Sequence, residues 1–236
     1  MPLSPDEIEV TPFALDDEQL LPLAIARDWL ADEELGRADR FRFQPLRERF
    51  VRGRAMMRWI LARHLDAEPG DLRFETGEHG KPRLLGEPLH FNLSHSENRA
   101  VLAVSRLPSI GIDIERFDRK VNVDALGRRC FRESEWAPFA SLDGDARKRA
   151  FFWMWTAKEA RMKATGDGFR LEPLKIEIRF AGSLPDACLE PVDPPAYLAP
   201  AELPGAEAAC TVAALSPFRV SLGHVNAESG IGAAPR

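Results

Sequence analysis

The stretch LHFNLSHSENRAVLAVSRLPSIGIDIE, residues 89–115, has the composition and turn spacing of three consecutive β-strands. The first segment covers residues 89–96 and ends in a polar turn. The second and third cover residues 99–105 and 110–115, and the turn RLPS joins them. Helical patterns precede and follow these strands, so we place the boundary between two halves of the chain near residues 106–110.

The third strand carries two acidic residues within the pentapeptide GIDIE. Side chains alternate across a strand, so Ile112 and Ile114 point to one face and Asp113 and Glu115 to the other. Two carboxylates this close repel each other unless a cation or a proton lies between them. Taken alone, the pentapeptide is better explained as an ordinary half-exposed strand with its polar residues facing water.

A strong helical pattern over residues 147–164 adds a third carboxylate and ends at the glycines of TGDG. Glu159 is four residues from both Trp155 and Lys163, so the three share a face. The simplest interpretation is a surface ion pair between Glu159 and Lys163, contributing at most ~0.5 kcal/mol. Because Glu159 also lies on or beside the apolar stripe, its carboxylate needs a partner such as a cation or a metal.

Asp113, Glu115 and Glu159 together offer an all-oxygen set of ligands, without a suitably spaced set of His or Cys residues. Such a set suits Mg²⁺, which prefers carboxylates, phosphate oxygens and water. The chain has 3 cysteines, and their wide spacing argues against a disulfide framework and against a zinc site.

The charge of the chain is unevenly distributed. The formal net charge is −5, which disfavours a general nucleic-acid binder. Residues 1–36 carry ten acidic residues and one arginine, whereas residues 37–63 carry nine arginines against two acidic residues. Within this basic segment, residues 46–65 have the pattern of an amphipathic helix. A local basic patch indicates a compact anionic ligand or an acidic partner, although a solvated helix face explains it equally well.

Two further short segments carry groups that bind phosphate. In FNLSHS, Ser94 and His95 are adjacent and therefore point apart, so they form no serine–base pair. The chain also contains no G-x-S-x-G, which argues against a serine hydrolase. The segment GKP at residues 80–82 places Lys81 on a constrained loop. Mg²⁺, lysines and arginines together describe a pocket for a polyphosphate.

The order of the elements predicts an α+β (α/β) protein, and 236 residues fit one large domain or two packed subdomains. We expect an N-terminal subdomain over residues 1–107, a C-terminal one over 108–223, and a disordered tail over 224–236. No apolar run approaches the roughly 18 residues of a membrane helix, and no signal peptide begins the chain. We therefore expect a cytoplasmic protein that does not associate with membranes.

The segments GKP, FNLSHS, GIDIE and WTAKEARMKATGDG occur in an order and at a spacing that resemble the Sfp-type 4′-phosphopantetheinyl transferases. The resemblance covers roughly residues 30–180. Any one of the four segments is weak, and their succession is highly specific. The resemblance implies a pseudo-dimer of two similar subdomains, each a small, mainly antiparallel sheet packed with helices, and an active site in the cleft between them. It implies transfer of the phosphopantetheine arm from coenzyme A to a serine of an acyl or peptidyl carrier protein, with release of adenosine 3′,5′-bisphosphate, by a monomeric enzyme.

The resemblance also implies roles for individual residues. The Mg²⁺ ligands are Asp113, Glu115 and Glu159. The catalytic residues are Glu159, as the base directly or through water, and Lys163, which stabilises phosphate charge. The residues expected to bind coenzyme A are Arg37, Arg40, Arg47, Arg49, Arg54, Gly80, Lys81, Pro82, Ser94, His95, Lys158 and Lys163. The family comparison aligns Arg37, Arg40 and Arg49 only loosely, and Arg47 and Arg54 come from the helical pattern.

Two other functions fit parts of the pattern. A Mg²⁺-dependent nucleotide phosphodiesterase or pyrophosphatase uses similar carboxylates, but it does not require FNLSHS and KEARMK in this order. A non-catalytic module that binds coenzyme A or a carrier protein tolerates loss of the acidic residues, and here all three are present.

Overall fold

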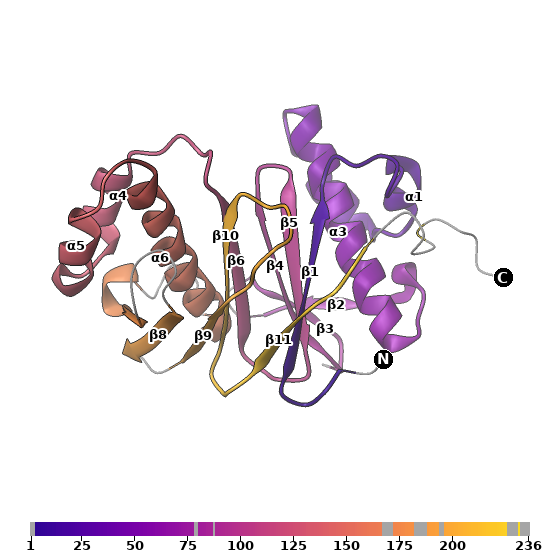
Figure 1. Ribbon diagram of the computed structural model, residues 1–236. Coiled ribbons are helices and arrows are strands. Elements are labelled where there is room, and N and C mark those ends of the chain that lie inside the picture. The colour runs from indigo at the N-terminus through magenta and orange to yellow at the C-terminus, as the bar shows by residue number, and fades with distance from the viewer. Residues whose placement is uncertain are drawn as a thin grey trace.

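The computed structural model describes residues 3–77, 80–86, 88–166, 172–181, 188–193, 196–225 and 231. Strands occupy the middle of the molecule, and helices lie on both sides of them (Figure 1). The helices are α1 (Leu23–Asp28), α2 (Asp32–Ala38), α3 (Gln44–Leu65), α4 (Val123–Cys130), α5 (Glu133–Ala140) and α6 (Gly144–Thr165), with 3-10 turns at Pro69–Asp71 and Pro173–Lys175. The strands are β1 (Glu7–Ala14), β2 (Phe74–Thr76), β3 (Pro82–Leu84), β4 (His90–Ser96), β5 (Arg99–Ser105), β6 (Ile110–Arg116), β7 (Glu177–Ala181), β8 (Cys188–Asp193), β9 (Tyr197–Pro200), β10 (Ala208–Ala214) and β11 (Arg219–Leu222).

The same order of helices and strands occurs twice along the chain. The first pass runs β1, α1, α2, α3, β2, β3, β4, β5, and the second runs β6, α4, α5, α6, β7, β8, β9, β10. The pairing repeats as well: the orders β1-β5-β4 and β6-β10-β9 correspond, and so do the hairpins β2-β3 and β7-β8. All of these pairs are antiparallel. The repeated topology supports the predicted arrangement of two similar halves within an α+β fold.

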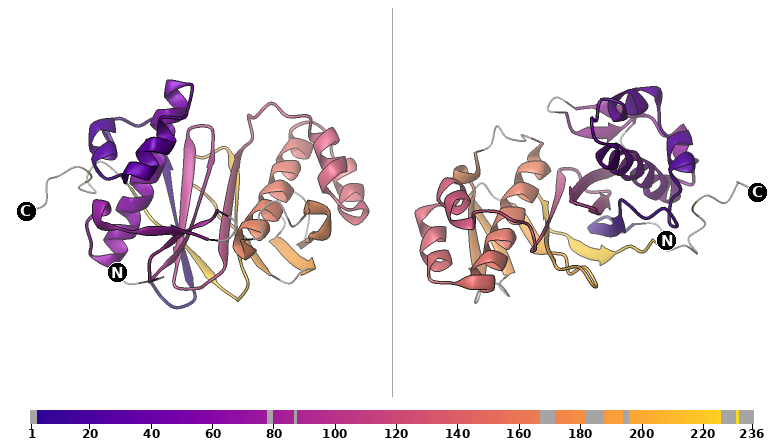
Figure 2. Two further views of the ribbon diagram at one scale, coloured as in Figure 1. Left: turned by 180° about the vertical axis from the view of Figure 1, so that it is seen from behind. Right: turned by 90° about the horizontal axis from the view of Figure 1, so that it is seen from above.

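The two main sheets meet where β4 lies beside β6. The strands belong to different sheets, and side chains of β4 accept hydrogen bonds from the backbone of β6. The N–H of Ile112 donates to Asn92 Oδ1 over 2.8 Å, and the N–H of Arg116 donates to Ser96 Oγ over 3.2 Å. This junction between β4 and β6 is called the seam below. Figure 2 shows from behind how the strands on either side of the seam run along one another.

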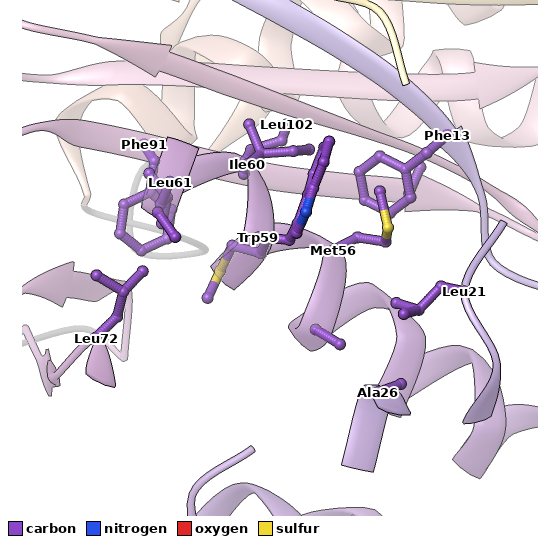
Figure 3. Close-up of a cluster of buried hydrophobic side chains, with 14 of the residues drawn as sticks. Phe13, Leu21, Ala26, Met56, Trp59, Ile60, Leu61, Leu72, Phe91 and Leu102 are labelled. Atoms are coloured by element: carbon purple, nitrogen blue, oxygen red, sulfur yellow. The ribbon is translucent and has the colours of Figure 1, made fainter. Parts of the chain in front are cut away.

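Apolar residues fill three regions. In the first half, α3 packs on the sheet through residues such as Met56, Ile60 and Leu102 (Figure 3). A second cluster joins α4, α5 and α6 through Phe131, Phe139, Phe151 and other residues. The third cluster lies behind the seam and draws on strands of both halves, since it contains Ile8, Val10, Val101, Ile112, Ile114 and Val212. The halves are therefore joined by a shared apolar core.

Most of the expected elements are present, with bounds shifted by a few residues. The strand expected over 89–96 begins one residue later, at His90, and the helix expected over 147–164 begins earlier, at Gly144. Strands β1 and β11 were not expected. They pair with each other in parallel, so β11 joins the sheet of the first half although it follows the second half in the sequence. The expected tail lies largely outside the described residues. Among the described helices, none has the length and apolar character needed to cross a bilayer.

Candidate functional site

A glycine brings the acidic strand and the long helix together. A Cβ atom on Gly111 would lie 2.1 Å from the backbone oxygen of Ala160 and 2.5 Å from the backbone nitrogen of Ala164, so only glycine permits this approach. Residues 111, 113 and 115 share one face of β6, and α6 lies against that face. The local sequence GIDIE thus places its two carboxylates beside the helix that carries Glu159 and Lys163.

Asp113, Ser94 and Lys163 form a hydrogen-bonded group at the seam. Lys163 Nζ lies 2.5 Å from Asp113 Oδ1 and 3.0 Å from Ser94 Oγ, and Ser94 Oγ donates to the same Asp113 oxygen over 2.7 Å. Asp113 is 5% exposed. Burial raises the pKa of Asp113, and the Lys163 charge opposes the rise without cancelling it. Its second oxygen, Oδ2, is buried and has no hydrogen-bond partner among the described residues.

Glu115 has a similar arrangement one step along the strand. Ser96 Oγ donates to Glu115 Oε2 over 2.7 Å, and the guanidinium of Arg119 forms an ion pair with Glu115 Oε1. Asn92, Ser94 and Ser96 alternate along β4 and all reach β6. Asn92, Ser96 and Arg119 were not among the expected site residues. The alternation within FNLSHS was the signal that could have revealed the first two.

Glu159 is half-buried on α6. Burial, together with the charges of Asp113 and Glu115, raises the pKa of Glu159 to about 7, although the charge of Lys163 opposes the rise. The three carboxylates are therefore close enough for their like charges to repel, and a cation among them would relieve this repulsion. No three acidic, His or Cys residues in the described ranges converge as a ready-made metal cage. The donor set nevertheless fits Mg²⁺ in its chemistry, because it is all oxygen and Asp113 Oδ2 lacks a partner.

A pocket of about 370 Å³ is lined by residues of α3 and β4, and its lining includes Leu93 and His95, the two chain neighbours of Ser94. It is within the size range of small-molecule sites. Six of the residues expected to bind coenzyme A line it: Arg37, Arg49, Arg54, Gly80, Pro82 and His95. Phe41 and Phe50 also line it, with ring centroids 5.3 Å apart, and the Arg37 guanidinium lies 5.4 Å from the Phe50 ring centroid. The pocket thus combines cations with flat apolar surfaces, which suits a nucleotide.

A second, open hollow of about 610 Å³ adjoins the pocket, and Arg49 and Glu97 line both. Arg49 makes long ion pairs, 3.9 Å to Asp16 and 3.7 Å to Glu97. Arg116, Arg119 and Lys120 also face this hollow. Cations therefore extend from the pocket toward the acidic residues of β6.

The remaining expected residues lie outside the pocket lining. Arg40 is exposed, and Arg47 donates to the carbonyl of Phe41 over 3.2 Å and lines a separate hollow of about 220 Å³. Of the arginines that do line the pocket, Arg54 is also paired with Glu34, whose Oε1 accepts a hydrogen bond from Arg54 Nε over 2.5 Å.

Lys158 and Lys81 are engaged elsewhere. Lys158 is 1% exposed, and its ammonium lies 2.8 Å from Glu135 Oε2 and 2.6 Å from the carbonyl oxygen of Ile176. The structure therefore places Lys158 within the packing of α5 and α6, away from the pocket. Lys81 Nζ donates to two backbone carbonyls rather than pointing into the pocket.

Comparison with known proteins gives a consistent family. A model of the 4′-phosphopantetheinyl transferase superfamily matches residues 109–190, and a model of the 4′-phosphopantetheinyl transferase N-terminal region matches residues 20–107. The chain is 39% identical over 180 residues to the 4′-phosphopantetheinyl transferase HetI of Nostoc sp. (strain PCC 7120), covering 73% of this chain and 75% of HetI. It is 29% identical over 153 residues to the 4′-phosphopantetheinyl transferase Sfp of Bacillus subtilis (strain 168), covering 64% of this chain and 67% of Sfp.

Proposed function

The chain belongs to the 4′-phosphopantetheinyl transferase superfamily, as an enzyme of the Sfp type, and from this premise we propose how its residues perform the reaction. The enzyme transfers phosphopantetheine from coenzyme A to a carrier protein. In the proposal, the nucleotide end of coenzyme A occupies the pocket between α3 and β4, and its diphosphate lies at the seam. The reaction then takes place where residues of both halves meet.

The observation that carries this proposal is the contact of Lys163 with Asp113 and Ser94 beside a pocket lined by arginines. Lys163 comes from the second half and Ser94 from the first. An ammonium and a hydroxyl held at one point are suited to bind phosphate oxygens. The pocket next to them supplies Arg37, Arg49 and aromatic rings. In a diphosphate joined to a nucleoside, the phosphates can bind Lys163 and Ser94 while the nucleoside occupies the pocket.

We propose that Asp113, Glu115 and Glu159 hold Mg²⁺ when coenzyme A binds. The unpartnered Asp113 Oδ2 and the raised pKa of Glu159 support this assignment. The ion, when bound, supplies Lewis-acid stabilisation of phosphate charge.

The protein's own residues account for the remaining chemistry. The serine hydroxyl of the carrier attacks the β-phosphorus of coenzyme A, the bond to the bridging oxygen breaks, and adenosine 3′,5′-bisphosphate leaves. Lys163 stabilises the charge that develops on the phosphate oxygens. Glu159 accepts the serine proton at its carboxylate, directly or through a water molecule. Ser94 and His95 hold phosphate oxygens, with His95 reaching them from the pocket side of β4.

The partners that follow from the family are coenzyme A and a carrier protein. We propose that the enzyme acts as a monomer, because the seam that carries the site is complete within one chain. The proposed subdomains are residues 1–107 and 108–223, supported by the repeated order of elements, except that β11 at Arg219–Leu222 pairs with β1 and so joins the sheet of the first half. We also propose a cytoplasmic enzyme that acts without membrane or nucleic acid.

The test uses coenzyme A, Mg²⁺ and a panel of apo acyl and peptidyl carrier proteins, with intact-mass spectrometry of the carrier. A carrier that gains the mass of one phosphopantetheine arm supports the function. Cleavage of coenzyme A with no gain on any carrier would point to a phosphodiesterase. Omission of Mg²⁺ in the presence of a chelator tests the metal separately, and the Asp113→Asn variant tests whether that carboxylate is needed.

A further inference from the structure

Lys81 joins the loop of the pocket to the other half of the molecule. Its ammonium donates to the carbonyl oxygen of Ile110 over 2.7 Å and to that of Lys163 over 2.9 Å, residues 29 and 82 positions away in the chain. Its neighbours Gly80 and Pro82 line the pocket. One side chain therefore contacts β6 and α6 from a loop that belongs to the first half.

The two carbonyls lie next to a close approach of α6 to β6. Ile110 directly precedes Gly111, where the missing Cβ allows the backbone of α6 to touch the strand. The carbonyl of Lys163 lies in the last turn of α6, which ends at Thr165. The last carbonyls of a helix lack partners within the helix, and a cation there is favourable. Lys81 thus caps the helix end and clamps it to the strand in one contact.

This contact is held at an electrostatic cost. Burial lowers the pKa of Lys81 to about 8, and the nearby charge of Lys163 lowers it too. Both acceptors of its hydrogen bonds are neutral carbonyls, so neither offsets the buried charge as a carboxylate does. Because burying the Lys81 charge lowers the unfolding free energy, we explain this contact by its effect on the position of α6 and not by a contribution to folding.

We propose that Lys81 is a positioning residue for the transfer reaction. It fixes the end of α6 against β6, so that the ammonium of Lys163 stays on Asp113 and Ser94 when the nucleotide binds in the pocket. This inference rests on the proposed function of the seam. It differs from the expectation that Lys81 binds coenzyme A, because the ammonium donates to backbone oxygens and the side chain is absent from the described pocket lining.

The first test compares the wild-type enzyme with Lys81→Met by steady-state transfer kinetics and by calorimetric titration with coenzyme A. Lys175→Met is the matched control, since Lys175 is exposed. We expect Lys81→Met to lower kcat at least about ten-fold, with less than about a three-fold change in KM for coenzyme A. A raised KM and weaker binding at unchanged kcat would mean that Lys81 contacts the substrate, which overturns the proposal.

A double-mutant cycle tests whether Lys81 acts through Lys163. If it does, Lys81→Met combined with Lys163→Ala has the same kcat as Lys163→Ala alone. Losses that multiply overturn the proposal. Should Lys81→Met fail to fold, Lys81→Arg keeps the charge and carries the same comparison, because the longer, planar guanidinium presents its N–H groups from different positions than the ammonium does. Lower kcat at unchanged KM then supports positioning, and unchanged kcat overturns it. An inactive wild-type enzyme, in contrast, rejects the proposed function itself.

Discussion

Replacement of Gly111 by alanine tests whether the close contact of α6 with β6 sets the geometry of the site. The added Cβ would lie 2.1 Å from the oxygen of Ala160, whereas real Cβ atoms essentially never come within 3.0 Å of such an atom. The helix must therefore retreat by at least about 0.9 Å. The obstructing atoms are backbone atoms of α6, so no flexible side chain can turn aside. Overpacking of this kind costs about 1–3 kcal/mol of unfolding free energy.

The retreat moves Lys163 and Glu159 together, because both lie on α6. A displacement near 1 Å of groups that contact the reacting atoms lowers rates by about 10²-fold. We therefore expect Gly111→Ala to lose transfer activity more severely than its stability loss explains. The measurements are kcat for carrier modification at a temperature where the variant is folded, and the unfolding free energy from urea titration.

Gly36→Ala is the matched control. Gly36 lies in α2, and a Cβ there would meet no atom within 4 Å. Alanine at a helical position is favoured over glycine by about 1 kcal/mol, so this variant should be as stable as the wild type or more so, with unchanged kcat. Wild-type kcat in Gly111→Ala would refute the claim that this glycine positions the catalytic residues.

Three further perturbations follow from the contacts. Lys163→Ala is expected to lower kcat by about 10²-fold with a smaller change in KM for coenzyme A; a raised KM at unchanged kcat in the same kinetics would contradict its role in the transition state. Lys158→Met leaves the buried carboxylate of Glu135 without its cation and should cost about 3–5 kcal/mol in urea unfolding, whereas adding Glu135→Leu should restore much of the loss. If the single variant is as stable as the wild type, the pair has no structural role. Burial alone would raise the pKa of Glu34, but Arg54 and other partners lower it below its usual 4.5. The ionised Glu34 therefore contributes to the unfolding free energy above pH 4.5, and this contribution is lost as the pH falls through the lowered pKa of the folded state. Calorimetry of Glu34→Gln should show lower stability at neutral pH and a weaker decline in acid; a decline equal to that of the wild type would count against this account.

Much of the site followed from short-range patterns. Alternation along GIDIE placed Ile112 and Ile114 on one face and Asp113 on the other, and in the structure the two isoleucines lie in a buried cluster while Asp113 contacts Lys163. The interval between Glu159 and Lys163 placed both on one side of α6. These inferences succeeded because strand and helix periods are local properties.

Long-range partners could not be predicted in the same way. Lys158 is adjacent to Glu159, yet its partner Glu135 comes from α5, and no spacing within one helix reveals that pair. The strand β1 was missed although Ile8 and Val10 alternate as strand residues do, because acidic residues surround them and Pro12 interrupts them. Its partner β5 lies about ninety residues later, where only the tertiary fold brings them together.

The location of the site follows from how the two halves are joined. An edge strand presents free backbone groups that pair readily with another strand. At the seam, β4 and β6 do not continue one ladder. Asn92 and Ser96 instead receive the N–H groups of β6 through their side chains. Side chains are longer than a direct ladder contact, so the strands are held apart, and Asp113 can face Ser94 and Lys163 in the space between. A site built in this way draws on β4, β6 and α6 together, so neither half contains it alone. In a urea titration, transfer activity should therefore be lost at a lower urea concentration than the helical signal of α3 and α6.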